Sequence, residues 1–503
     1  MGDNFSIDLK TGKSLPSKLL LLGEVLLFAI LAGMTSSHFG MADGAKITMA
    51  YLVAYAVPRT VLTRSRGSSL ASRLVLVLLT ILLIYINFRR LTTWTFFDDF
   101  SLEMPNLNGD GRGYYKWALN RYDGRIPVSG NMVFPGFPLM MVALWKMLGV
   151  SVVWPQAMNM MFTLLAVVLT GMTTRRLLSH RVSVPPSTLL TAGMALCCLL
   201  MYYFVMGTAI LKEASIMLAI ALAGFVMAAM EGDEQERQSP RRDLVLFILA
   251  CSLLAVVRTT YLYFVLMGLV VMTIPHHRRD WRMSAALLAV IVVALVGGNA
   301  MSSYSFDRHA EIAGGGWNMQ RFYIIGESQQ FYHDMLDYYF LRPAWHKALM
   351  LPLTMSVQFI IPFPWSYYDT PTLLTIMGRM TYGWYVIGGI SLFYFAHVSW
   401  RRDGTMGWWP WWAALSYAAI AYIMAGAVAR YVVPIQPLFI PVAIYVLCRL
   451  WEGRWRKAFV WWSVGFILLL TLALLVCLEI QQDTFSKMLG VRSLTHYMQG
   501  IPY

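Results

Sequence analysis

The stretch AFVWWSVGFILLLTLALLVCL (residues 458–478) contains no charged residue. It is long enough to cross a bilayer as a helix, because a membrane-spanning helix needs about 20 apolar residues. Similar apolar runs recur along the chain and predict about thirteen spans, near residues 19–35, 46–62, 74–90, 154–173, 187–205, 208–230, 243–257, 259–275, 284–300, 381–399, 408–426, 431–449 and 458–478.

The composition of the whole chain agrees with these runs. Apolar residues make up 58% of the 503 residues, charged residues only 13%, and the mean hydropathy is +0.57. Soluble domains carry about 25% charged residues, so the composition excludes a soluble enzyme, a disordered scaffold and a fibrous repeat. It predicts an all-α polytopic membrane protein whose residues 1–503 form a single transmembrane domain.

The net charge of +14 does not indicate a nucleic-acid partner, because Lys and Arg fall in short clusters between the apolar runs. Such clusters are typical of cytoplasmic loops. We therefore place the N-terminus inside, which makes two long polar segments extracytoplasmic, residues 91–153 and 301–380. This orientation requires the proline-interrupted stretch 346–364 to be re-entrant or to lie on the outer surface.

The first long outer segment carries acidic residues in unusual places. Asp98 and Asp99 are adjacent at the predicted membrane face, where carboxylates are costly unless they are hydrated, paired or functional. Asp110 lies among glycines, so the backbone can fold tightly around it. Each of these acids could instead be a loop or helix-capping residue. A later apolar piece, residues 139–148, is too short to span, and we expect Trp145 and Lys146 to hold it at the membrane interface.

The order of features in this segment resembles the first extracytoplasmic loop of the GT-C superfamily of membrane glycosyltransferases. That family's Asp-x-x-x-Tyr-x-x-x-Ala pattern matches Asp110, Tyr114 and Ala118. A Pro-Gly-Phe-Pro run, a short amphipathic helix and a membrane helix ending in two arginines follow. The resemblance implies polyprenyl-phosphate-linked sugar donors and a catalytic Asp base, here Asp110 or the competing pair Asp99 and Asp98. The chain departs from the family plan by having three predicted helices, rather than one, before this loop.

Charged residues at the outer ends of later spans extend the resemblance. Lys212 and Glu213 open one span, as a basic–acidic pair facing the active site often does in the family, and Arg258 lies between two apolar runs. Arg430 and Tyr431 precede two spaced prolines and open a late span. The resemblance makes Arg430, Arg258 and Lys212 candidate ligands of the donor phosphate, for which the fork of Arg is well suited. The alternatives are a snorkelling Lys paired with Glu, and a hairpin-tip charge for Arg258.

Two further residues of the second outer segment are candidates for lining the substrate site. Trp365 ends an Ile-Pro-Phe-Pro-Trp stretch that recurs in membrane enzymes handling surface polysaccharide, and Arg321 lies in a polar, aromatic region. Trp365 could equally be an interfacial anchor, and Arg321 part of a hydrated loop. With Tyr114, Glu213 and Tyr431 they complete the predicted substrate lining.

The sequence thus predicts a transferase that moves a sugar from a polyprenyl-phosphate carrier to a hydroxyl of a glycan, lipid or protein acceptor, inverting the anomeric centre. No cofactor is required. Asp98 and Asp99 could bind a divalent metal (Mg²⁺ or Mn²⁺), as in some of the enzymes that the chain resembles. Membrane lipids are the other expected partner. The role implied is in cell-envelope polysaccharide biosynthesis, in the plasma (bacterial inner) membrane with an extracytoplasmic active site. The alternatives are a surface-polysaccharide polymerase or ligase, and a transporter or flippase of lipid-linked sugars.

Overall fold

A computed structural model describes residues 15–94, 101–103, 105, 107, 109–125, 136–231, 240–273, 345, 348–349, 351–352, 355–356, 359, 382–399, 406–424 and 431–481. Within these residues every regular element is a helix. Six of the helices that they contain are long and apolar enough to cross a membrane, at Pro16–Phe39, Leu70–Thr92, Val153–Leu178, Glu213–Glu231, Val433–Trp451 and Arg456–Leu475. The chain is therefore an integral membrane protein with an all-helical fold.

The predicted all-helical membrane fold is confirmed, but the predicted number of about thirteen spans is not. Each predicted span other than 284–300, which lies outside the described residues, falls on helical structure, although several of the helices are short. The predicted span 187–205 is not one continuous helix. The structure has α7 (Pro186–Cys197) and α8 (Met201–Thr208), separated where Leu200 leaves the helical conformation at φ −88° and ψ 62°.

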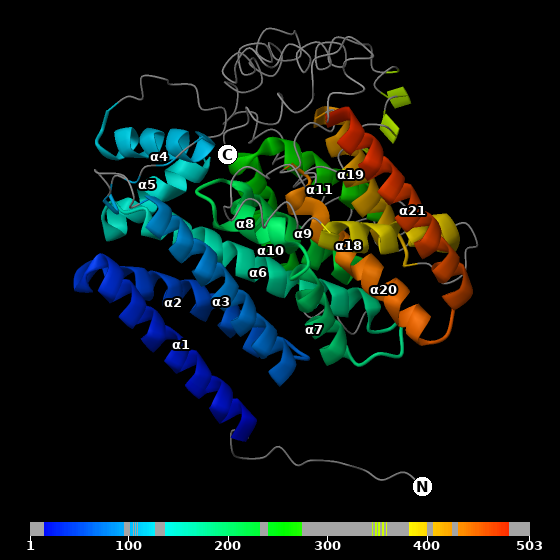
Figure 1. Cartoon of the computed structure of the whole chain (residues 1–503), viewed down its shortest axis with the longest axis horizontal. Coiled ribbons are helices and arrows are strands. Elements are labelled where there is room, and N and C mark those ends of the chain that lie inside the picture. Colours follow the sequence, from blue (N-terminus) through cyan, green and yellow to red (C-terminus); the bar gives the residue numbers. More distant parts are fainter. Residues whose placement is uncertain are drawn as a thin grey trace.

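Two helices form the centre of the bundle, α6 (Val153–Leu178) and α9 (Glu213–Glu231). They pack against each other along their length, with α2 (Met41–Arg64) and α7 on α6, and α10 (Pro240–Val257) on α9. The two helices are buried almost all round, as expected for the core of a membrane bundle. Figure 1 shows α1 (Leu15–Phe39), α2 and α3 (Leu70–Trp94) on one flank of this pair.

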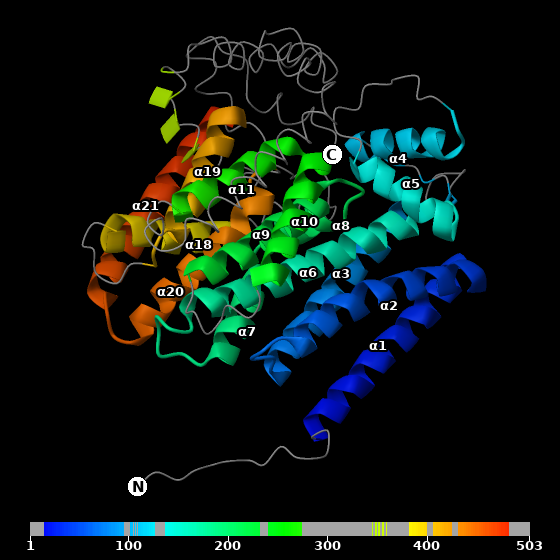
Figure 2. The ribbon, with the colours of Figure 1, turned by 180° about the vertical axis from the view of Figure 1, so that it is seen from behind.

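The opposite flank contains the C-terminal helices. These are α18 (Tyr382–Phe393), α19 (Trp409–Met424), α20 (Ile440–Trp451) and α21 (Arg456–Gln481), and α11 (Thr259–Thr273) packs on α19. Figure 2 shows the same division from behind. None of the span window in α21 is buried, and its exposed leucines and isoleucines suit contact with lipid chains.

Small residues allow the central helices to approach closely. A Cβ added to Gly193 of α7 would lie 2.9 Å from Cα of Gly171 in α6, and one added to Gly207 would overlap the side chain of Thr163. Such contacts replace hydrophobic driving force with van der Waals packing, as is common between helices in lipid. They hold α7 and α8 against one face of α6.

A 3₁₀ helix, η5 (Val433–Phe439), precedes α20 and contains two prolines. Because 3₁₀ geometry and proline leave carbonyl groups without helical partners, other elements must supply donors. Tyr261 Oη donates to the carbonyl of Tyr431 at 2.7 Å, and Trp409 Nε1 donates to that of Leu438 at 2.9 Å. These bonds fix Tyr431 at the start of η5.

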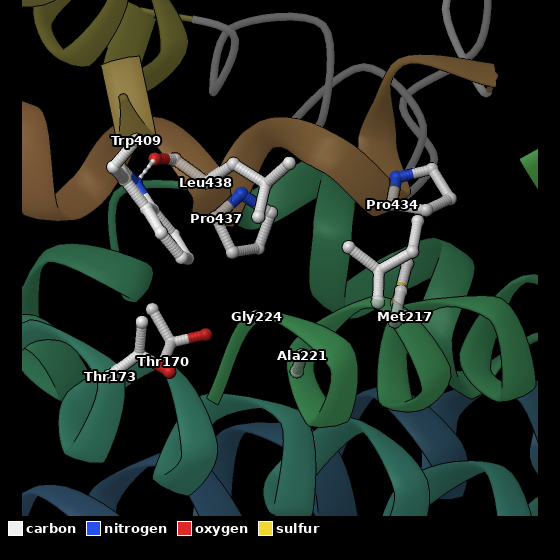
Figure 3. A pocket seen from close by; sticks show the side chains of 10 residues that line it. Thr170, Thr173, Met217, Ala221, Gly224, Trp409, Pro434, Pro437 and Leu438 are labelled. Carbon is white, nitrogen blue, oxygen red and sulfur yellow. Dashed lines mark hydrogen bonds between the residues drawn. The ribbon is translucent and has the colours of Figure 1, made fainter. Parts of the chain in front are cut away.

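A small pocket lies between η5, α6, α9 and α19 (Figure 3). It is narrow and partly open, and it is lined by Thr170, Thr173, Met217, Ile220, Ala221, Gly224, Trp409, Pro434, Pro437 and Leu438. Its lining carries no ionisable side chain, so it is a packing gap within the bundle and contains none of the predicted site residues.

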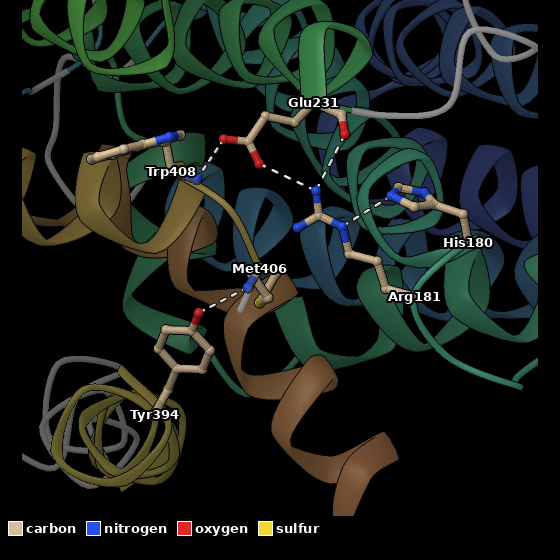
Figure 4. Close-up of polar contacts among 6 residues, drawn as sticks. All are labelled: His180, Arg181, Glu231, Tyr394, Met406 and Trp408. Carbon is tan, nitrogen blue, oxygen red and sulfur yellow. Dashed lines mark hydrogen bonds and ion pairs between the residues drawn. The ribbon is translucent and has the colours of Figure 1, made fainter. Parts of the chain in front are cut away.

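A polar network ties the helices together at one end of the bundle (Figure 4). The Glu231 carboxylate, at the end of α9, accepts the Trp408 N–H at 2.6 Å and pairs with Arg181 Nη2 at 3.5 Å. Nearby, the Met406 N–H donates to Tyr394 Oη at 2.9 Å. These residues come from the segments after α6, in α9, after α18 and before α19, so the network closes the end of the bundle where α9 finishes.

Candidate functional site

Predicted site residues meet at the other end of the bundle, where α9 begins. Four segments converge there: α4 (Gly109–Tyr122), the junction between α8 and α9, the turn between α10 and α11, and the start of η5. Gly111 of α4 lies so close to the junction that an added Cβ would be 3.3 Å from the carbonyl oxygen of Ile210. The beginning of α4 therefore contacts the chain just before Lys212.

Lys212 is buried at this junction, with 7% of its surface exposed. Its Nζ lies 5.8 Å from the ring centroid of Tyr114, within the range of a cation–π contact. It directly precedes the first residue of α9, where the helix dipole disfavours a cation. An anion bound at this helix start would compensate that cost.

Glu213 begins α9 and is 3% exposed. Its carboxylate lies where the helix dipole stabilises negative charge, and it interacts electrostatically with Arg258. Among the residues that the structure describes, its Oε2 has no hydrogen-bond partner. A buried carboxylate oxygen without a partner is costly, so the site has capacity for a further donor.

Arg258 lies in the turn between α10 and α11 and is 7% exposed. Its guanidinium is 4.2 Å from the ring centroid of Tyr431 and 5.9 Å from that of Tyr261. Burial lowers the pKa of Arg258, but Tyr431, Tyr261 and Glu213 raise it by more, so the group stays cationic. Its Nε lacks a hydrogen-bond partner within the described part of the chain.

The short helices α4 and α5 (Gly136–Leu148) help to position Tyr114 and the turn that contains Arg258. The ring of Tyr114 packs edge-on against Phe137 of α5, with centroids 5.9 Å apart. Gly136 contacts Val256 of α10, two residues before Arg258. The helix α5 thus connects Tyr114 to the turn that holds Arg258.

The expectation that Trp145 anchors α5 at the membrane interface is wrong. Its side chain is fully buried, packs against Tyr115 and donates from Nε1 to the carbonyl of Ser151 at 2.9 Å. Lys146, in contrast, is exposed. The burial arises because α5 packs on α4, α6 and α10, which leaves its Trp face no access to the interface.

Of the predicted site residues, the structure brings together Tyr114, Lys212, Glu213, Arg258 and Tyr431. Asp110 lies in the first turn of α4, beside this cluster by backbone position, but its side chain lies outside the described atoms. Asp98, Asp99, Arg321, Trp365 and Arg430 also lie outside the described residues, so their predicted roles stay predictions. Within the described part of the chain no three His, Cys, Asp or Glu side chains are grouped as metal ligands.

Sequence reasoning missed two residues of the site region. Tyr261 fixes the backbone of Tyr431 and contacts Arg258, and Asn159 of α6 donates to two carbonyls of the α8–α9 junction. Both lie in predicted spans. The presence of an amide side chain inside an apolar run was the available signal for Asn159.

The geometry defines a polytopic helical membrane protein with a buried, charged site at one end of its bundle. In a comparison with protein families, residues 212–406 resemble a family described as predicted membrane protein (DUF2142). This match includes Lys212, Glu213 and Arg258, but Tyr114 and Tyr431 lie outside it. No curated protein and no solved structure matches the chain.

Proposed function

We propose that the protein is an integral-membrane glycosyltransferase. It moves a sugar from a polyprenyl-phosphate-linked donor to an acceptor hydroxyl on the extracytoplasmic face. The observation that carries the proposal is the convergence of two buried cations, Lys212 and Arg258, with Glu213, Tyr114 and Tyr431 beside the start of α4.

A lipid phosphate fits this cluster better than a soluble anion does. Lys212 and Arg258 are buried within a membrane protein, in segments that directly adjoin apolar helices. Bound phosphate would supply a negative charge and several acceptor oxygens to these two buried cations. A polyprenyl phosphate places that charge at the end of a long apolar chain, which the surrounding helices and lipid can solvate.

The residues divide into two roles in the proposed reaction. A carboxylate, Asp110 or the pair Asp99 and Asp98, takes the proton of the acceptor hydroxyl as its oxygen attacks the anomeric carbon. The bond between that carbon and the phosphate oxygen breaks, and the electron pair leaves with the phosphate. Lys212 and Arg258, with Arg430, stabilise this developing charge. A single displacement of this kind inverts the anomeric centre.

The position of the site supports an extracytoplasmic location. Lys212, Arg258 and Tyr114 lie at the end where α9 begins, while Arg175 and Arg176 end α6 at the other. Since clustered arginines in short segments favour the cytoplasm, the site end faces outward in the proposed topology. The membrane would then be the plasma membrane, and in a bacterium the inner membrane.

The test is turnover by purified protein with a panel of polyprenyl-phosphate sugars, read as release of polyprenyl phosphate. The proposal expects release with at least one donor, in proportion to transferred sugar, and loss of release in the double variant Lys212→Met/Arg258→Met. The matched control is Lys46→Met, which removes a partly exposed Lys paired with Asp43 on α2. Equal release by the double variant, or no release from any donor by folded protein, would overturn the proposal.

A further inference from the structure

The chain before Lys212 is irregular, although it lies against the core of the bundle. After α8 ends at Thr208, residues 209–212 form no helix, and the Leu211 N–H bonds to the carbonyl of Ala209 only two residues earlier. Irregular backbone at membrane depth persists where neighbouring elements satisfy its polar groups. The contacts of this segment therefore decide how Lys212 and Glu213 are oriented.

One side chain supplies most of these contacts. Asn159 of α6 is fully buried, and its Nδ2 donates both to the carbonyl of Leu211, at 2.9 Å, and to that of Ala209, at 2.5 Å. One amide group thus binds the carbonyls of the two residues on either side of Ile210, in the segment that leads into Lys212. The neighbouring Thr163, one turn along α6, donates to the carbonyl of Gly207 at 3.1 Å.

We propose that Asn159 is a positioning residue that fixes the α8–α9 junction and thereby holds Lys212 and Glu213 in place for the donor phosphate. The inference rests on the proposed function for the identity of the ligand. The physical basis is that both bonds come from one rigid, buried side chain on a helix, so the junction has one preferred geometry. Sites supported in this way lose affinity when the support moves by about an ångström.

The N-terminal helices contact α6 and α8 through other polar bonds. One turn before Asn159, Gln156 accepts from Tyr51 of α2 at 2.8 Å and donates to the carbonyl of Asn87 in α3. Arg90 of α3 donates to the carbonyl of Val205 in α8 at 2.9 Å. None of these three bonds involves residues 209–212, so they hold the N-terminal helices on α6 and α8 separately from the bonds that Asn159 makes.

The variant Asn159→Leu tests the inference, because Leu has the same number and branching of side-chain heavy atoms as Asn but cannot donate. The first readout is the rate at which an amine-reactive reagent acylates Lys212 in the whole protein in detergent. The label on Lys212 is quantified by peptide mass spectrometry after digestion. Loss of Asn159 should free the junction and raise the labelling rate about fivefold, as expected from about one net hydrogen bond. The second readout is binding of polyprenyl phosphate, expected to weaken about tenfold, equivalent to about 1.4 kcal/mol.

Gln156→Leu is the matched control on the same helix. It removes buried hydrogen bonds to α2 and α3 but none to residues 209–211, so it should lower thermal stability and leave Lys212 labelling unchanged. If Gln156→Leu raises the labelling as much as Asn159→Leu does, the effect is general loosening and the inference is wrong. Unchanged labelling and affinity in folded Asn159→Leu would also contradict it.

Three further variants keep the test decisive if Asn159→Leu does not fold. Asn159→Gln retains an amide donor and should restore slow labelling in part, whereas Thr163→Val removes only the bond to Gly207 and should raise labelling less than Asn159→Leu. Asn159→Ala removes the amide without adding bulk, and wild-type labelling in that variant would refute a role for this support. If the wild type binds no polyprenyl phosphate, the proposed function fails, while the labelling of Lys212 still decides whether Asn159 positions it.

Discussion

Replacement of Arg258 should weaken donor binding in a graded way. The guanidinium is buried, lies 4.2 Å from the ring centroid of Tyr431, and has Glu213 as an electrostatic neighbour. Arg258→Lys keeps the charge but loses the fork and much of the stacking. Arg258→Met keeps the apolar length and loses the charge.

The size of each effect follows from these contacts. The contact of Arg258 with Tyr431 lies within the protein, so its loss in Arg258→Lys lowers stability with and without donor. A lost charged hydrogen bond to the donor costs about 1.5–3 kcal/mol of binding free energy. The lost hydrogen bond predicts that Arg258→Lys binds the donor roughly 10- to 150-fold more weakly. Arg258→Met removes a buried charged contact altogether, for which about 2–5 kcal/mol is typical, so its affinity should be lower still.

The assay is equilibrium binding of polyprenyl phosphate to detergent-solubilised variants at fixed detergent concentration. Arg258→Met alone leaves the Glu213 carboxylate buried without its cationic neighbour, which lowers stability. The double variant Glu213→Gln/Arg258→Met removes both charges and therefore separates this stability cost from the effect on ligand binding. Thermal stability should recover in the double variant and affinity should not. Wild-type affinity in folded Arg258→Met would refute the phosphate site.

Three other predictions follow from the site and the topology. Asn at the true base among Asp110, Asp99 and Asp98 should reduce turnover about 10²–10⁴-fold with little change in donor affinity, measured by polyprenyl phosphate release; near-normal turnover in all three variants would exclude a carboxylate base. A cysteine at Asn108 should react with an impermeant thiol reagent on intact cells, and reaction only after permeabilisation would invert the orientation. Glu231→Gln, at the opposite end of the bundle, should reduce the free energy of unfolding by about 1.5–3 kcal/mol, because it weakens the bonds to Arg181 and Trp408; a thermal shift assay should show this with donor affinity retained, and lost affinity would mean that the two ends are coupled.

The positions of the long helices could be predicted from the sequence, because a helix that crosses the bilayer needs about 20 apolar residues. The break between α7 and α8 could not, because residues 187–205 form an uninterrupted apolar run. Its division depends on close packing against α6, where Gly193 meets Gly171 and Gly207 meets Thr163. These contacts join segments far apart in the sequence.

The charged members of the site could also be predicted, because Lys212, Glu213 and Arg258 interrupt apolar sequence where a charge is costly. Their mutual proximity is a property of the fold and emerges only from the structure. For Trp145, in contrast, the prediction from residue type was wrong. Its residue type suits an interface, but the packing of α5 on three other helices buries it.

The central claim is that the chain transfers sugar from a lipid phosphate, and the stoichiometry of a single reaction tests it most directly. Purified protein in lipid nanodiscs is supplied with a polyprenyl-phosphate sugar and an acceptor, and both released polyprenyl phosphate and glycosylated acceptor are quantified. The account predicts one polyprenyl phosphate for each sugar transferred, with inverted anomeric configuration in the product and no release by Lys212→Met/Arg258→Met. Movement of intact polyprenyl-phosphate sugar across the membrane without cleavage, at the same rate in this variant, would contradict it.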